Sequence, residues 1–320
     1  MPFPAERPDA SGQGGTFMLT AHASDPLGPI MYTVTLLADP VRANLDRAAV
    51  ESLSDAWGGG AAAWLNPGIA AEFSVLTLPD NRWDIWSALQ AIGLDMVVQE
   101  TDGRRKKMLL ADMDSTMIAQ ECIDELADMA GKGPRVAAIT TRAMNGELDF
   151  EAALIERVDL LHGLPEAVIA QVIRERITYT PGGRELVATM KANGGHAALV
   201  SGGFTAFTAV VAARLGFDEH RANRLLTSCG KLTGEVARPI LGRAAKVDAL
   251  HDIAGRLNIA PAEVMAVGDG ANDLGMLGVA GAGVALHAKP SVAAQCDIRI
   301  NHGDLTGLLY IQGYAASAFC

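Results

Sequence analysis

Three short apolar runs, each followed by a helix-like segment, constrain the fold of this chain most. They are MLLA (108–111), AALV (197–200) and VMAVG (264–268), and GAGVAL (281–286) is a further candidate strand. Strands that alternate with helices form an open parallel sheet with helices on both faces. The sequence therefore predicts an α/β domain over residues 101–320, built on a Rossmann-like parallel sheet.

Polar residues follow the three runs where the strands are expected to end. Asp112 and Asp114 follow the first run, Ser201 and Gly202 the second, and Asp269 the third. Because the carboxyl ends of parallel strands lie at one edge of a sheet, we expect these side chains to meet. Three carboxylates placed together need a hard cation among them, and Mg²⁺ prefers oxygen ligands. The sequence therefore predicts a Mg²⁺ site at this edge.

The serine–glycine segment supplies groups that bind an anion. Ser201 and the Gly202–Gly203 backbone can point a hydroxyl and N–H groups at a phosphate, and Lys246 can add a positive charge. With Mg²⁺ these groups would neutralise a phosphoryl group from several directions. One aspartate can then attack phosphorus while its neighbour handles protons, so the predicted chemistry is phosphoryl transfer through an aspartyl-phosphate.

Residues 121–180 interrupt the alternation of strands and helices. They contain four helix-like segments, ECIDELADMA, RVAAITTRAMN, DFEAALIERVDLLHG and EAVIAQVIRERI. An all-helical insertion directly after the first strand of the sheet is expected to form a cap over the site.

The N-terminal part of the chain has a different pattern. Residues 31–100 show strand-like and helix-like segments in the order βαββαβ, which predicts a ferredoxin-like α+β domain. This segment has no histidine, and we expect its carboxylates to face solvent. Residues 1–30 contain Pro, Gly and Ser but no continuous apolar core of a signal peptide, so they are predicted to be a disordered leader.

Charge and cysteine content exclude several classes of protein. With 26 basic and 37 acidic residues the net charge is -11, which argues against a nucleic-acid surface, and no polybasic stretch indicates membrane binding. The uncharged segment 197–213 is interrupted by Ser-Gly-Gly and falls short of the ~18–20 apolar residues that a membrane span needs. The four cysteines form no C-x-x-C pair, which fits a reducing cytoplasm.

Each motif taken alone has an ordinary explanation. A D-x-D pair also occurs at helix caps and surface turns, and a lysine in a helix usually lies on the surface. GDGAND (268–273) could be a turn or a calcium loop, although it lacks the later glutamate of an EF-hand. The catalytic interpretation is favoured because the motifs occur together and at the ends of strands.

Four motifs carry a resemblance to a known family. DMDST (112–116), SGG (201–203), Lys246 and GDGANDLGML (268–277) resemble, in this order, the motifs of the haloacid-dehalogenase-superfamily phosphatases. The resemblance covers about residues 108–310, and it extends through the cap to the branch of this superfamily that hydrolyses O-phospho-L-serine.

The resemblance implies a role for each matching residue. Asp112 would be the nucleophile, and Asp114 would protonate the departing serine oxygen and then activate water. Mg²⁺ would be held by Asp112, Asp269 and the main-chain carbonyl of Asp114, with Asp273 in support. Three groups would hold the phosphoryl oxygens, with Asn272 close by: Ser201, Gly202 and Lys246.

Within the cap, Glu121 and Arg157 match the pair that reads the substrate. A glutamate can accept the ammonium of phosphoserine, and the planar arginine fork can bind its carboxylate. Without the resemblance, a charged pair in a helical cap would be read as a solvated face. Met144 and Phe150 match apolar cap positions that would shield the reaction from water.

The N-terminal domain resembles the ACT-type regulatory fold. Its first turn, ADPVRAN (38–44), lacks the glycine that amino-acid-binding versions often place there. A packing or dimerisation role is therefore at least as well favoured as binding of an effector.

The predicted function is Mg²⁺-dependent hydrolysis of O-phospho-L-serine in the cytoplasm, as the last step of serine biosynthesis. The alternatives left open are a related small-molecule phosphatase, a phosphotransferase, and a vestigial amino-acid-binding regulatory protein. No nucleic-acid or membrane partner is expected, and a homodimer stays open.

Overall fold

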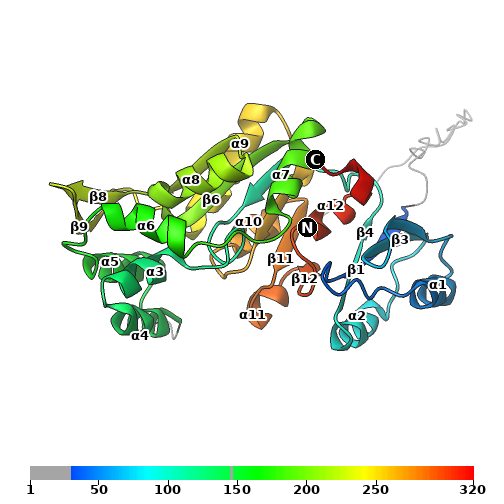
Figure 1. Ribbon diagram of the computed structural model, residues 1–320. Helices are drawn as coiled ribbons and strands as arrows, with labels where there is room; N and C mark the ends of the chain where they lie inside the picture. The colour runs from blue at the N-terminus through cyan, green and yellow to red at the C-terminus, as the bar shows by residue number, and fades with distance from the viewer. Residues whose placement is uncertain (1–29, 145–146) are drawn as a thin grey trace, which may run out of the picture.

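The computed structural model describes residues 30–144 and 147–320, so the predicted leader lies outside the described residues except for Ile30. Figure 1 shows a central sheet with a helical cap at one end and a small domain at the other. No helix in the described part of the chain is long and apolar enough to cross a lipid bilayer.

The small domain is a four-stranded antiparallel sheet covered by two helices. Its strands have the order β2-β3-β1-β4, which confirms the predicted ferredoxin-like topology. Alternate residues such as Val34 and Leu36 face the helices, as the two-residue period of a strand requires. The elements are β1 (Tyr32–Ala38), α1 (Arg47–Ala56), β2 (Ala63–Asn66), β3 (Ala70–Val75), α2 (Arg82–Ala91) and β4 (Leu94–Glu100).

One expectation about this domain is wrong, because Asp95 in β4 does not face solvent. Asp95 is 0% exposed, and its carboxylate accepts hydrogen bonds from three successive backbone N–H groups of the core domain. The N–H groups of Asn301, His302 and Gly303 lie 3.0, 2.9 and 2.8 Å from its oxygens. The loop that supplies them is about 200 positions further along the chain, so local sequence gives no sign of it.

The core is a six-stranded sheet in which every neighbouring pair is parallel, as the sequence predicts. The strand order is β12-β11-β10-β5-β6-β7. The polar strand β7 and the short strand β12 were not predicted. The strands are β5 (Met108–Ala111), β6 (His196–Phe204), β7 (Glu219–Asn223), β10 (Val264–Gly268), β11 (Ala282–Leu286) and β12 (Ile298–Ile300).

Helices cover both faces of the core sheet, because its strands are apolar on both sides. Met108 and Leu110 pack with α9 and α10 on one face, whereas Leu109 and Ala111 belong to the larger cluster with α7, α8 and α12. The helices are α7 (Gly183–Ala192), α8 (Thr205–Leu215), α9 (Arg243–Leu257), α10 (Leu274–Val279), α11 (Pro290–Ala293) and α12 (Gly307–Tyr310), with 3₁₀ turns at η1 (Pro261–Glu263) and η2 (Ala316–Ala318).

The cap follows β5 and consists of four helices, as expected. They are α3 (Cys122–Met129), α4 (Gly133–Met144), α5 (Phe150–Asp159) and α6 (Ala167–Glu175). An unpredicted hairpin, β8 (Leu225–Ser228) and β9 (Lys231–Val236), packs against this cap. The N–H of Gly163 donates to the carbonyl of Leu232, and the N–H of Leu232 donates to the carbonyl of Leu164, both at 2.9 Å. The hairpin therefore ties the cap to the core.

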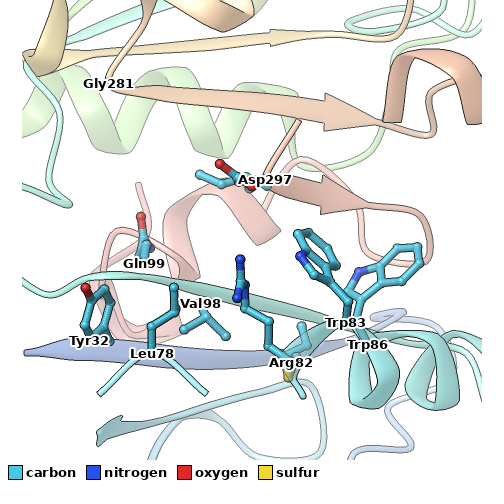
Figure 2. A pocket seen from close by; sticks show the side chains of 11 residues that line it. Tyr32, Leu78, Arg82, Trp83, Trp86, Val98, Gln99, Gly281 and Asp297 are labelled. Carbon is cyan, nitrogen blue, oxygen red and sulfur yellow. The ribbon is translucent and has the colours of Figure 1, made fainter. Parts of the chain in front are cut away.

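A pocket of about 260 Å³ lies where the small domain meets the edge of the core. Figure 2 shows Trp83 and Trp86 from α2 on one side of it and Asp297, just before β12, on the other. The guanidinium of Arg299 lies 4.1 Å from the ring of Trp83 and 5.1 Å from that of Trp86, which joins α2 to β12. This pocket contains none of the predicted site residues, so it is separate from the predicted site.

Candidate active site

The predicted site residues come together at the carboxyl edge of the core sheet. Asp112 follows β5, Ser201 lies near the end of the neighbouring β6, and Asp269 follows β10 on the other side of β5. The pairing of β6 with β7 is irregular between Val200 and Phe204, so the serine–glycine segment departs from the regular ladder. This departure frees its backbone groups for other contacts.

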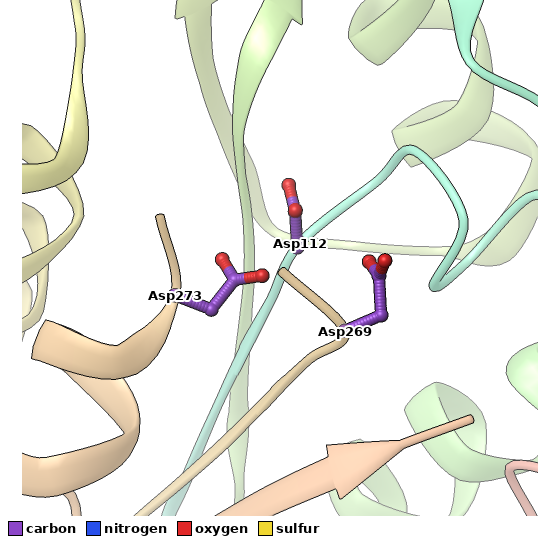
Figure 3. A group of neighbouring side chains, drawn as sticks. All are labelled: Asp112, Asp269 and Asp273. Carbon is purple, nitrogen blue, oxygen red and sulfur yellow. The ribbon is translucent and has the colours of Figure 1, made fainter. Parts of the chain in front are cut away.

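Three carboxylates form the centre of the site. Asp112, Asp269 and Asp273 each offer an oxygen within 4.8 Å of the others, as Figure 3 illustrates. The Nζ atom of Lys246 lies 2.7 Å from Oδ1 of Asp112 and 2.6 Å from Oδ1 of Asp273. Lys246 is only 2% exposed, unlike an ordinary helix lysine.

The charge balance of this cluster favours a divalent cation. Among residues 30–144 and 147–320, the ammonium of Lys246 lies within 4 Å of two of these three carboxylates, so the cluster keeps two negative charges when all four groups are ionised. Burial raises the pKa of Asp112 well above its usual value, and Asp273 adds to this effect while Lys246 opposes it. Burial also raises the pKa of Asp269 to about 6. An all-oxygen donor set with this charge fits a hard divalent ion such as Mg²⁺.

Asp114 faces a different set of partners. Its Oδ1 accepts from the backbone N–H of Cys122 at 3.0 Å, and its Oδ2 accepts from the Ser201 hydroxyl at 3.2 Å. A Cβ atom at Gly203 would lie 2.6 Å from Oδ2 of Asp114, so only glycine fits beside this carboxylate. Burial raises the pKa of Asp114, which favours the protonated form.

The cap places one acidic and one basic side chain over this edge. Oε1 of Glu121, at the start of α3, accepts from the Ser115 hydroxyl at 2.8 Å. Although part of Glu121 is exposed, desolvation of its carboxyl group and the nearby Asp114 raise its pKa to about 7. A glutamate in this state binds a proton or a cation readily.

Arg157, in α5, keeps most of its hydrogen-bonding capacity. Its Nε donates to the carbonyl of Ala153 at 3.2 Å, and no carboxylate among the described residues lies within 4 Å of it. Burial lowers the pKa of Arg157, while the charges of Asp124 and Glu121 oppose that shift. The planar guanidinium can therefore still bind a carboxylate in a bidentate manner.

The remaining predicted residues lie in the cap and in the loop before α10. Phe150 of the cap lies over the core, since a Cβ atom at Gly202 would be 3.0 Å from its ring and one at Gly242 would be 3.3 Å away. Asn272 is half-exposed beside Asp273 in the loop that starts α10.

Two residues of this region were missed by reasoning from the sequence. The hydroxyl of Thr116 donates to Oδ1 of Asp269 at 3.1 Å and orients that carboxylate. Asn223 is 2% exposed at the end of β7, where its amide contacts the serine–glycine segment. Thr116 stands within the DMDST motif and could have been found there, but Asn223 had no signal because β7 itself was not recognised.

Comparisons with known proteins identify the family that this chain matches. The family model of the haloacid dehalogenase-like hydrolases matches residues 109–278. A phosphoserine phosphatase of Vibrio cholerae is 42% identical over 72% of this chain and 70% of its own length. A phosphoserine phosphatase of Albidiferax ferrireducens is 47% identical over 63% of this chain and 88% of its own length.

Solved structures also resemble this chain, two of them over nearly its full length. A haloacid dehalogenase family hydrolase from Salmonella enterica serovar Typhi has a TM-score of 0.80 at 31% identity and covers 88% of this chain and 98% of its own. A probable phosphoserine phosphatase from Vibrio cholerae has a TM-score of 0.72 at 34% identity and covers 90% of this chain and 88% of its own. A substrate-bound phosphoserine phosphatase has a TM-score of 0.61 at 41% identity over 64% of this chain and 98% of its own.

Proposed function

This chain belongs to the haloacid dehalogenase-like hydrolases, and on that premise we propose that it is a phosphoserine phosphatase that releases L-serine and phosphate. The observation that carries the proposal is the pairing of two sites. A buried carboxylate cluster lies at the sheet edge, and an acidic and a basic cap residue are available above it. The relatives named above support the substrate.

Asp112 is the proposed nucleophile. Its Oδ1 accepts from Lys246 and from the N–H of Met113 at 2.8 Å, which leaves Oδ2 without a hydrogen bond among the described residues. Attack of this oxygen on phosphorus forms an aspartyl-phosphate and breaks the bond between phosphorus and the serine oxygen. Burial raises the pKa of Asp114, which favours its protonated form, and in that form Asp114 gives its proton to that oxygen.

Hydrolysis returns the site to its starting state. Asp114, now ionised, takes a proton from a water molecule, whose oxygen attacks phosphorus. The bond between phosphorus and the Asp112 carboxylate then breaks, and phosphate leaves. Ser201, the Gly202 backbone and Lys246 hold the phosphoryl oxygens throughout, while Asn272 lies close to them.

The carboxylate cluster is the proposed place of the metal. Asp112, Asp269 and the main-chain carbonyl of Asp114 would hold Mg²⁺, and Asp273 supports the cluster through its contact with Lys246. Bound Mg²⁺ supplies positive charge that neutralises the phosphoryl oxygens.

Glu121 and Arg157 are the proposed readers of the amino acid. The glutamate would accept the ammonium of phosphoserine, and the guanidinium would bind its carboxylate. Phe150, which lies over Gly202 and Gly242, would keep water from the reacting groups.

We also propose a division of the chain into domains and a location in the cell. The domains are 31–100, an ACT-like packing or dimerisation domain, and 101–320, a phosphatase domain with its cap at about 121–180. The βαββαβ order and the sheet order β2-β3-β1-β4 support the first of these. A cytoplasmic location is supported by four cysteines that all remain free.

The test is phosphate release from L-phosphoserine, D-phosphoserine, phosphothreonine, sugar phosphates and nucleotides, each with Mg²⁺ and after chelation. We expect selective release from L-phosphoserine that chelation abolishes and added Mg²⁺ restores. Release only from other esters would discard the substrate and keep the chemistry. No release from any of them would favour a vestigial regulatory protein, and formation of a new phosphoester with an added alcohol would indicate a phosphotransferase.

A further inference from the structure

We propose that Asn223 is a positioning residue for the phosphoryl-binding groups. This proposal rests on the proposed function, because Asn223 would fix the distance between Ser201 and Lys246, which hold the phosphoryl group. Asn223 ends β7, the strand next to β6, and is 2% exposed. Its contacts reach two segments that lie 21 and 18 positions away in the sequence.

Every polar atom of the Asn223 amide is used. Its Nδ2 donates to the carbonyl of Gly202 at 2.8 Å and to the carbonyl of Leu241 at 3.2 Å. Its Oδ1 accepts from the N–H of Leu241 at 2.7 Å. One side chain thus replaces the regular strand pairing that is interrupted between Val200 and Phe204.

On the β6 side, a chain of hydrogen bonds links Asn223 to Asp114. The carbonyl of Gly202 and the N–H of Gly203 belong to one peptide plane, so holding the carbonyl also fixes the direction of the N–H. That N–H donates to Oγ of Ser201 at 2.8 Å, and the Ser201 hydroxyl in turn donates to Oδ2 of Asp114. The orientation of the Ser201 hydroxyl therefore depends on the peptide that Asn223 holds.

On the α9 side, Asn223 is linked to Lys246 through the start of the helix. Both backbone polar groups of Leu241 bind Asn223, and the next residue, Gly242, is the N-cap of α9. Lys246 lies in the first turns of this helix and bridges Asp112 and Asp273. Asn223 therefore fixes the point at which the helix that carries Lys246 begins.

The cap rests on the same two segments. The ring of Phe150 lies against both Gly202 and Gly242. A shift of either segment relative to the other would change the surface on which the cap closes. Since small displacements of catalytic groups slow reactions strongly, we expect the loss of Asn223 to affect the chemical step.

Asn223→Asp is the sharpest variant, because it keeps the shape of the side chain and removes both N–H donors. Its carboxylate would face the carbonyls of Gly202 and Leu241, where it repels them. We expect kcat to fall about 100-fold for phosphoserine and for p-nitrophenyl phosphate alike. KM for phosphoserine should rise by no more than about tenfold, because Glu121 and Arg157 still hold the amino acid and only the contacts to the phosphoryl group are weakened.

Asn193→Asp is the matched control. Asn193 is the C-cap of α7, and its Nδ2 likewise donates to a backbone carbonyl, that of Thr189, at 2.8 Å. It contacts none of the proposed catalytic or binding residues. We expect Asn193→Asp to lower the unfolding midpoint and to leave kcat unchanged.

Affinity for inorganic phosphate, measured by calorimetry on the full chain, gives a readout that does not depend on turnover. We expect Asn223→Asp to weaken it by about tenfold. If Asn223→Asp lowers only the unfolding midpoint, as the control does, and keeps wild-type kcat and phosphate affinity, the proposal is wrong. If circular dichroism shows that Asn223→Asp does not fold, Asn223→Ser takes its place with the same expectations.

The substrate proposal can fail separately. If the wild type hydrolyses p-nitrophenyl phosphate and not phosphoserine, only the substrate is wrong, and kcat for p-nitrophenyl phosphate decides the role of Asn223. If the wild type hydrolyses neither ester, the phosphate affinities of the wild type and Asn223→Asp decide it.

Discussion

Lys246 and the buried aspartates depend on each other for stability. An isolated buried charge is costly, whereas Lys246 meets Asp112 at 2.7 Å and Asp273 at 2.6 Å. The excess of carboxylates over ammonium groups keeps the cluster negative, and a cluster in this state attracts a divalent ion. The same arrangement would hold a metal ion and keep Asp112 oriented for the proposed attack.

Replacing the proposed nucleophile, Asp112, should separate activity from folding. In Asp112→Asn the amide retains the size of the side chain and relieves repulsion with Asp269 and Asp273, so the protein should remain folded. We expect kcat for phosphoserine to fall on the order of 10⁴-fold. Steady-state phosphate release and circular dichroism measure the two effects.

A matched control for this variant is Asp218→Asn. Asp218 accepts from the N–H of Ala197, at the start of β6 and so at the amino end of the sheet, and pairs with Lys191 at 2.7 Å. The Asp218→Asn protein should be less stable than the wild type and should keep the wild-type kcat. Turnover by Asp112→Asn within a few-fold of the wild type would remove the nucleophile assignment.

Arg157 should act on binding of the substrate's carboxylate. Hydrogen bonds to charged groups contribute roughly 1.5–3 kcal/mol, so Arg157→Ala should raise KM for phosphoserine about 10- to 100-fold. KM for p-nitrophenyl phosphate, which has no carboxylate, should change little. Arg142→Ala is the control, since Arg142 is an exposed cap residue that pairs with Glu156 at 2.8 Å. Equal effects of Arg157→Ala on both substrates would contradict the role.

At the residue scale, the sequence located the groups that stand directly at the ends of apolar strands. Asp112 and Asp269 follow runs that are easily recognised, and parallel strands bring such ends together. Asn223 was not predicted, because the sequence of β7, Glu-His-Arg-Ala-Asn, lacks the apolar pattern of a buried strand. The burial of Lys246 was also not visible, since it depends on where α9 begins.

At the scale of elements, the hairpin β8–β9 joins the cap to the core through backbone hydrogen bonds. It turns through Cys229 and Gly230, which both have positive φ, and pairs Ser228 with Lys231. The sequence predicted an all-helical cap and not the hairpin, because these strands lie outside the cap segment and are only partly buried. The cap residues that pair with these strands, 163–166, lie about 65 positions earlier in the sequence.

Gly234 in β9 tests whether this contact matters. Its φ is +78°, and a Cβ atom there would lie 3.1 Å from Cβ of His162 and 3.3 Å from the carbonyl oxygen of Asp159. Gly230 is the matched control, with φ +71° and no atom within 4 Å of the place that a Cβ would take. Gly234→Ala should therefore lower the free energy of unfolding by about 1 kcal/mol more than Gly230→Ala.

Gly234→Ala should also weaken substrate binding. Asp159, which the new methyl group would displace, and Arg157 belong to the same helix, α5. We expect KM for phosphoserine to rise in Gly234→Ala and to stay unchanged in Gly230→Ala. Urea denaturation and steady-state kinetics measure these effects. Equal destabilisation by the two substitutions would show that the hairpin does not hold the cap through this contact.

At the scale of the whole molecule, the small domain and the cap lie at opposite ends of the core (Figure 1). The sequence predicted the topology of both parts, because each follows from local periodicity. It did not predict how the small domain attaches, since the contacts join residues far apart in the chain. Asp95 with residues 301–303 is one such contact, and the bidentate pair of Arg104 with Glu72 is another.

Asp95 gives the last prediction, because it separates attachment of the small domain from catalysis. Asp95→Ala leaves three backbone N–H groups of residues 301–303 without their acceptor, which should cost at least about 3 kcal/mol of unfolding free energy. Asp102→Ala, at an exposed position in the connector, should change stability by no more than about 0.5 kcal/mol. Because the cap lies at the other end of the core, kcat of the folded Asp95→Ala protein should stay within about twofold of the wild type. Urea denaturation and phosphate release at a temperature below the transition measure the two quantities, and a large fall in kcat without loss of stability would instead show that the small domain controls the active site.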